Sequence, residues 1–252
     1  MRALRASEIL DLWETSGRHH GVDLALILLQ TASPELSWER LVRLTVGQRD
    51  ERLMRLRELT FGSLLRLQTP CPQCSEALEL ELESPRLRVG SASSAGPHES
   101  QWEGWRLQWR LPDSEDLAAL ARLGGQAIGD GEGVSSGEGL LLQRCLLALW
   151  DEEGRQRVAG ELPAAGRAAL GEAMSAADPQ AEVIFDLRCP RCEHRWQSLL
   201  DIVEIFTQEL ATQSRRLLAE VHFLARYYGW READILALSG RRRQAYLDLA
   251  RA

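Results

Sequence analysis

The pattern of hydrophobic and polar positions predicts helices at both ends of the chain. In the first 62 residues, SEILDLWE offers a serine start, VDLALILL is an apolar run, and VGQRDERLMRLREL places Leu53, Leu56 and Leu59 on one face. From residue 199 onward, apolar positions recur at helical spacing up to a break at Gly229, and two short helical segments follow in READILAL and RRRQAYLDLA. We therefore expect helical segments over 1–62 and 199–252.

Two further segments change to a period of two, and each contains a pair of cysteines. LLRLQT and ALELELE flank the first pair, with Leu78, Leu80 and Leu82 alternating with glutamates. AEVIFDL and EHRWQSLL flank the second pair in the same way. These patterns predict two β-hairpins, over 63–84 and 181–198.

The insertion between the hairpins, 85–180, is expected to contain a linker, a strand and mainly helices. After the small polar stretch RVGSASSAGPHESQ, WRLQWRL reads as a strand that stops at Pro112. PDSEDLAALARL predicts a helix with Asp113 or Ser114 as its N-cap. Beyond the glycine-rich stretch GGQAIGDGEGVSSGEG, which we expect to be a flexible linker, LLLQRCLLALW predicts one apolar helix in which Cys145 fills core space.

The composition is that of an acidic globular protein. The 252 residues are 44% hydrophobic with a formal net charge of −7, and the 30 cationic side chains in that count are all arginine. An acidic total argues against general affinity for nucleic acid, because binding to the phosphate backbone needs cationic contacts. No run of about 18 apolar residues and no signal-peptide pattern occurs, so we expect a cytoplasmic protein. The motif HExxH and the phosphate loop are missing from the sequence, so no enzyme is expected.

Four of the five cysteines form two CPxC pairs, Cys71 with Cys74 and Cys189 with Cys192. Each CPxC turn presents two thiolates from a tight knuckle, and zinc favours four such ligands in a tetrahedron. In a reducing cytoplasm, these pairs indicate metal or redox chemistry rather than structural disulfides. We therefore predict one structural zinc ion per chain, bound by all four cysteines.

The spacing of the two pairs departs from that of a compact zinc ribbon. Between Cys74 and Cys189 lie 114 residues, against roughly 15–20 in a compact site. We predict a split ribbon, in which the hairpin Leu64 to Glu83 pairs beside the hairpin Glu182 to Ser198 and the insertion leaves from the far end. The fold class expected is α+β, with helical N- and C-terminal segments around this split four-cysteine zinc ribbon and a mixed, mainly helical insertion.

Two other interpretations of the cysteine pairs stay open. In a thioredoxin-like dithiol, the CPxC would follow a strand and open a helix, whereas strands are expected after both pairs here. Nucleic-acid binding is common among zinc ribbons, but the first hairpin exposes glutamates where phosphate would have to approach. Only the second hairpin, with Arg188, Arg191 and Arg195, is basic.

The C-terminal stretch HFLARYYGWREADILALSGRRRQAYLDLA combines a helix ending in tyrosines, a Gly-Trp break, an ILAL turn, an arginine run and a further tyrosine. Over His222 to Leu249 this pattern resembles the baseplate hub assembly chaperones of T-even phages and their relatives in prophages and contractile injection systems. TFGSLLRLQTPCPQCSEALELELE also looks like larger members of that group, which carry cysteine pairs. The resemblance implies a non-enzymatic assembly chaperone or minor structural component of a contractile phage-tail baseplate, with baseplate or hub proteins as partners.

Five residues of this stretch are candidates for binding such a partner. Trp230 and Tyr246 offer aromatic anchors, whereas Arg241, Arg242 and Arg243 offer guanidinium forks to carboxylates. The same segment could instead be a self-packed helical hairpin with a solvated arginine run, and both descriptions can hold together. The competing function is a zinc-ribbon adaptor that binds nucleic acid or the transcription machinery.

Overall fold

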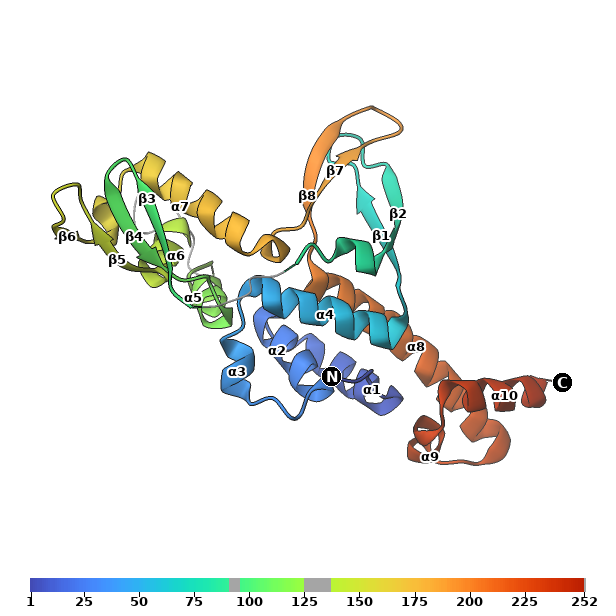
Figure 1. Ribbon diagram of the computed structural model, residues 1–252. Helices are drawn as coiled ribbons and strands as arrows, with labels where there is room; N and C mark the ends of the chain where they lie inside the picture. Colours follow the sequence, from blue (N-terminus) through green and yellow to red (C-terminus); the bar gives the residue numbers. More distant parts are fainter. Residues whose placement is uncertain (91–95, 125–136, 252) are drawn as a thin grey trace.

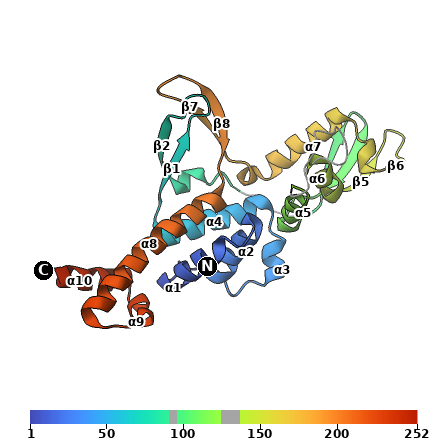
Figure 2. The ribbon, with the colours of Figure 1, turned by 180° about the vertical axis from the view of Figure 1, so that it is seen from behind.

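The computed structural model describes residues 1–90, 96–124 and 137–251 of an α+β protein, the class predicted from the sequence. A helical body lies at the centre and three arms project from it: a ribbon arm, an insertion arm and a C-terminal arm (Figure 1). The same arrangement is seen from behind (Figure 2). The accessible surface is 14,902 Å², well above the roughly 11,000 Å² expected for a compact monomer of 28.3 kDa.

The body consists of the N-terminal helices and the first half of the long helix α8. Its elements are α1 (Ala6–Ser16), α2 (Gly21–Ala32), α3 (Trp38–Val42), α4 (Val46–Phe61) and α8 (Ile202–Tyr228). The buried core includes Leu28, Leu53 and Phe206, so α8 packs on the N-terminal helices. Thr45 and Gln48 form a capping box that starts α4, which explains why the helix begins there. The three expected N-terminal helices are confirmed, and the short α3 is an addition.

The ribbon arm contains both predicted hairpins. The strands β1 (Leu64–Pro70) and β2 (Ala77–Glu83) pair antiparallel, as do β7 (Ile184–Arg188) and β8 (Arg195–Leu199). The two hairpins lie side by side in both views, but they form separate two-stranded sheets (Figures 1 and 2). Within the described residues, no strand ladder therefore joins the two hairpins. The insertion leaves after β2 and returns before β7, at the end away from the cysteines, as expected.

The insertion arm is a sheet covered by helices. It contains η1 (Ser84–Leu87), β3 (His98–Trp102), β4 (Trp105–Trp109), α5 (Ser114–Gly124), α6 (Gly137–Cys145), β5 (Leu146–Trp150), β6 (Gln156–Arg157), η2 (Ala159–Glu161), α7 (Ala164–Ala177) and η3 (Pro179–Ala181). The strand order is β3-β4-β5-β6. The predicted N-cap of α5 is confirmed, because the Asp113 carboxylate accepts hydrogen bonds from the amides of Glu115 and Asp116. The expected glycine-rich linker falls largely on 125–136, and part of the polar linker on 91–95, both outside the described residues.

One prediction for the insertion is wrong. LLLQRCLLALW does not form a single helix, because α6 ends at Cys145 and Leu146–Trp150 is the strand β5, paired with β4. An apolar run of this length is compatible with helix and strand, and pairing with β4 decides between them. Leu149 then faces the core while Leu147 is exposed. Cys145 is buried, as expected. With four strands, the insertion is more evenly mixed than the sequence indicated.

The C-terminal arm is formed by the end of α8, α9 (Glu232–Ala237) and α10 (Gly240–Arg251). Gly229 ends α8 with a φ of 70°, a left-handed conformation that glycine adopts without strain, so the predicted break is confirmed. Val221, Leu224, Ile235 and Leu247 form a small core separate from that of the body. Among the described helices, none combines the length and the hydrophobicity needed to cross a membrane.

Candidate metal centre

The four CPxC cysteines lie in the turns at the tip of the ribbon arm. Both turns have the same backbone geometry. In the first turn, the amide of Cys71 donates to the carbonyl of Glu76, and the amide of Ser75 donates to the carbonyl of Cys71. In the second turn, the amide of Cys189 donates to the carbonyl of His194, and the amide of Glu193 donates to the carbonyl of Cys189. Ser75 and Glu193 have positive φ values of 58° and 59°. Each turn thereby directs two thiols toward the other hairpin.

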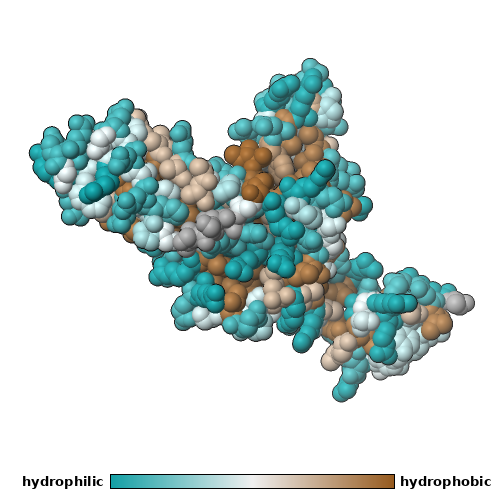
Figure 3. Space-filling view, viewed as in Figure 1, coloured by the Kyte–Doolittle hydropathy of each residue, from teal (hydrophilic) through white to brown (hydrophobic). Residues whose placement is uncertain are grey.

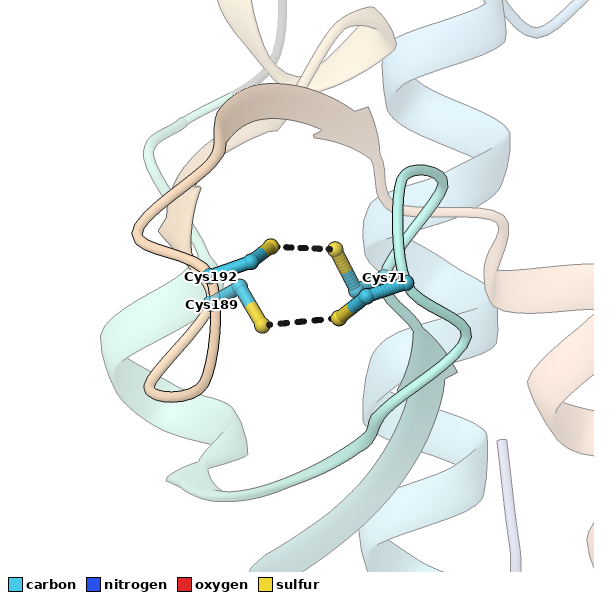
Figure 4. Close-up of side chains that lie close together, drawn as sticks. Cys71, Cys189 and Cys192 are labelled. Carbon is cyan, nitrogen blue, oxygen red and sulfur yellow. Dashed lines mark hydrogen bonds between the residues drawn. The ribbon is translucent and has the colours of Figure 1, made fainter.

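The four sulfur atoms converge on one point between the hairpins (Figure 4). The Sγ atoms of Cys71 and Cys192 are 3.7 Å apart, those of Cys74 and Cys189 are 3.6 Å apart, and all four lie within 4.8 Å of one another. A disulfide would require about 2.05 Å, and all five cysteines are free. A tetrahedron with metal–sulfur bonds of about 2.3 Å has edges of about 3.8 Å, so these separations suit one metal ion.

The surroundings of the sulfurs are closed rather than open to substrate. Cys71 and Cys189 are buried, while Cys74 and Cys192 are half-buried. Leu78 and Trp196 pack against the cluster, and His194 stacks on Trp196 with ring centroids 5.9 Å apart. Four protein thiolates can fill the coordination shell of a tetrahedral metal ion. His194 is therefore a neighbour of the cluster through Trp196.

The thiols influence one another's protonation. Burial raises the pKa of Cys189, but the amides of Cys192 and Arg191 and the thiol of Cys74 outweigh it and lower the pKa to about 7. The amide of Glu76 lowers the pKa of Cys74, yet burial and the three neighbouring sulfurs raise it to about 12. Once one thiolate forms, ionising the next costs more because like charges repel. A bound cation would remove that repulsion.

Two of the three arginines that make the second hairpin basic form ion pairs. Arg191 pairs with Glu76 of the first hairpin at 3.2 Å, and Arg188 pairs with Glu193 in its own turn. Arg195 is exposed. The pair Arg191–Glu76 joins the two hairpins beside the cysteines, so this basic group contributes to the ribbon itself.

The five C-terminal candidates do not share one surface. Trp230 and Tyr246 are half-buried and meet edge to face with ring centroids 4.8 Å apart. The Arg243 side chain is buried, and its Nε donates to Glu220 at 3.0 Å while Nη1 donates to the carbonyl of Leu238. Arg241 and Arg242 are exposed. Of the candidates, these two arginines therefore remain accessible to a partner, and the other three belong to the arm's own packing.

A buried arginine that the sequence analysis did not select fixes the root of the ribbon arm. Arg57 donates to both carboxylate oxygens of Glu209 on α8, at 2.9 and 2.6 Å. It also donates to the carbonyls of Gly62 and Leu64, where β1 begins. Its burial could not be predicted from the sequence, because no local pattern distinguishes Arg57 from the exposed arginines of α4.

Cys145 is unlike the four clustered cysteines. Burial raises the pKa of its thiol to about 12, and the nearby carboxylate of Asp116 acts in the same direction. A thiol with so high a pKa is a poor nucleophile, which agrees with the expected role in core packing.

No protein-family model, no curated protein and no solved structure matches this chain.

Proposed function

We propose that the chain is a non-enzymatic assembly chaperone or minor structural component of a contractile phage-tail-like baseplate, with one structural zinc ion bound by its four clustered cysteines. In this proposal the partners are baseplate or hub proteins. The zinc ion has no catalytic role; it holds the two hairpins of a split ribbon together.

Zinc is supported by the donor set and the distances. Four thiolates at separations of 3.6 to 4.8 Å suit a soft, tetrahedral ion, and zinc is the common ion of closed four-cysteine sites. The two separate hairpins need a cross-link, because side-chain contacts alone would leave each two-stranded sheet marginally stable. Metal binding contributes directly to folding free energy in such sites.

The observation that carries the assembly role is the construction of the C-terminal arm. The stretch that resembles baseplate hub assembly chaperones forms a helical unit with its own small core at the outer end of α8 (Figure 1). Arg241 and Arg242 are exposed there. A protein with three projecting arms presents separate surfaces to several subunits, which is useful in assembly and has no evident use in catalysis at a single site.

Other surface features support contact with partner proteins. In the space-filling view, hydrophilic residues cover the outer end of the ribbon arm and hydrophobic residues gather nearer its root (Figure 3). Ile184 and Leu199, which lie opposite each other in β7 and β8, are 44% and 59% exposed. The competing adaptor role has less support, since the ion pairs of Arg188 and Arg191 leave little unpaired positive charge on the ribbon for phosphate.

The test is deletion of the gene from a strain whose gene cluster encodes sheath, tube and spike proteins. We expect loss of sheathed particles in electron micrographs, restored by the full-length chain. Complementation with Arg241→Ala/Arg242→Ala should restore fewer particles, while Arg86→Ala, an exposed arginine on η1, should complement fully. Normal, active particles in the deletion strain would contradict the assembly role.

A further inference from the structure

A groove between α8 and α10 in the C-terminal arm offers a more specific partner site than the candidates chosen from the sequence. Its volume is about 530 Å³. Ala219 and Phe223 of α8 and Leu247 of α10 provide its apolar surface. The rest of its lining is polar or charged, from Arg216, Glu220, His222, Gln244 and Arg251. Trp230 and Tyr246 are not among the residues that line it.

The apolar surface continues along α8 beyond the groove. Ala219, Phe223 and Tyr227 follow one another at intervals of four residues, so they form one stripe on the helix. The rings of Phe223 and Tyr227 are parallel with centroids 6.4 Å apart, and Tyr227 is 59% exposed. The stripe covers about two turns, or roughly 12 Å along the axis. It is long enough for a partner segment of similar length.

Arginines outnumber carboxylates around this apolar stripe, where Glu220 lines the groove and Asp248 accepts a hydrogen bond from Gln244. The guanidinium of Arg251 lies over the ring of Phe223, 5.6 Å from its centroid. Glu220 forms ion pairs with both Arg216 and Arg243, each at 3.0 Å. One negative charge therefore faces two positive charges. The surface is therefore locally cationic on a protein whose net charge is −7.

Two further arginines extend the cationic border along α8. Arg215 and Arg226 are exposed and, by their spacing from Ala219, lie on the same side of the helix. Neither has a carboxylate partner in the part of the chain that the structure describes. Guanidinium groups without partners at the edge of an apolar groove favour a ligand that combines carboxylates with apolar side chains.

We propose that this groove binds an acidic amphipathic helix of a partner protein, with about two turns of that helix in contact with the stripe. Apolar side chains of that helix, spaced three or four residues apart, fill the groove over Ala219, Phe223 and Leu247, and its carboxylates pair with Arg251, Arg215 and Arg226. The inference rests on the proposed assembly role and adds the chemistry of the partner. A helix suits a groove bounded by two helices, because a third helix completes the packing that α8 and α10 begin.

The experiment selects ligands from a displayed library of random 16-residue peptides on the full-length, zinc-loaded protein. We expect enriched peptides to be acidic, with apolar residues at helical spacing. Their affinity, measured by fluorescence anisotropy, should fall at least tenfold with Tyr227→Ser and with Arg251→Glu. The matched control is Arg231→Glu, which makes the same charge change at an 84% exposed position on the same arm and should leave binding unchanged.

Several results would overturn the proposal. These are a lack of enriched peptides, enrichment of basic peptides, and equal binding to the Tyr227→Ser protein. Tighter binding of a fluorescent single-stranded oligonucleotide than of any peptide would assign the arginines to nucleic acid instead. A concentration-dependent dimer abolished by Tyr227→Ser would identify a second copy of this chain as the occupant. If acidic peptides bind as expected but the deletion strain builds normal particles, the groove assignment stands and the assembly role fails.

Discussion

The backbone amide of Gly47 donates a buried hydrogen bond of 2.9 Å to the carboxylate of Asp178, 131 positions later in the chain. Gly47 lies in the first turn of α4, where amides lack partners within the helix, and Asp178 follows the end of α7. The negative charge of Asp178 is also favourable at the positive end of α4. This contact fixes the returning end of the insertion to the body, directly before the second hairpin begins.

Gly47→Ala should destabilise the protein by roughly 1–3 kcal/mol, because a methyl group at this position would overlap the Asp178 carboxylate. The measurement is chemical denaturation of the full chain followed by circular dichroism. Gly171→Ala is the matched control, since a methyl group there meets nothing within 4 Å in the exposed part of α7. It should stabilise the protein by up to about 1 kcal/mol. Equal effects of the two substitutions would show that Asp178 moves away at no cost.

Arg57→Ala should be among the most destabilising single substitutions, costing about 3–5 kcal/mol. The side chain of Arg57 is 2% exposed, and its removal leaves Glu209 and two backbone carbonyls without their donor. Arg66→Ala is the control, because the pair Arg66–Glu81 is largely exposed and should contribute less than about 1 kcal/mol. The same denaturation experiment compares them. Similar midpoints for the two variants would argue against an anchoring role for Arg57.

The sequence predicted those parts of the fold that depend on local patterns. Alternation around CPxC indicated both hairpins, and the tetrahedral preference of zinc indicated that Cys71 and Cys192 would meet. Contacts such as Gly47–Asp178 and Arg57–Glu209 could not be predicted, because a lone glycine or arginine in a helix has no local feature that reveals its distant neighbour.

Two features of the structure differ from what the sequence suggested, and both have physical causes. Leu146–Trp150 is apolar enough for helix or strand, and its pairing with β4 depends on residues some 40 positions earlier. Arg243 looked like part of an exposed run, but α10 places it on the same face as the buried Leu247. Arg241 and Arg242 lie on other faces of α10 and are exposed. The three consecutive arginines therefore do not form one surface.

Asp116 should make the insertion arm sensitive to acid. Burial alone would raise the pKa of its carboxyl, but the side chain of Arg110, the amide of Asp113 and the side chain of Arg144 outweigh burial and lower the pKa to about 2. Because the folded pKa lies below the unfolded value of about 3.9, the stabilisation is fully present above pH 4 to 5 and is lost as the pH falls through 2. The difference corresponds to roughly 2.5 kcal/mol.

The measurement for Asp116 is the free energy of unfolding at pH 6 and at pH 3, for the natural chain and for Asp116→Asn. The variant should be less stable at pH 6, and its stability should fall less between the two pH values. Protonation of the cysteine cluster affects both proteins equally and cancels in the comparison. Parallel pH profiles would mean that Asp116 does not carry this sensitivity.

Removal of the metal should separate the two hairpins of the ribbon arm. We expect about one zinc ion per chain in purified protein by elemental analysis, and none after treatment with a strong chelator. Without the ion, thiolates at the four cysteines repel one another unless they take up protons. No strand ladder within the described residues joins β1–β2 to β7–β8. The ribbon should then become susceptible to proteolysis around 63–84 and 181–198, while the helical body keeps its circular dichroism signal.

Two cysteine variants separate this effect from general damage to the fold. Cys189→Ser removes one of the four thiolates, so it should lower the zinc content and expose both hairpins to protease, including the first hairpin, which it does not alter. Cys145→Ser, in the buried core of the insertion arm, should destabilise that arm yet leave one zinc ion per chain. A metal-free protein with an unchanged proteolytic pattern would show that side-chain packing alone holds the ribbon. Recovery of Cys71–Cys192 and Cys74–Cys189 disulfides from protein kept in reducing buffer would instead favour redox chemistry at the same four sulfurs.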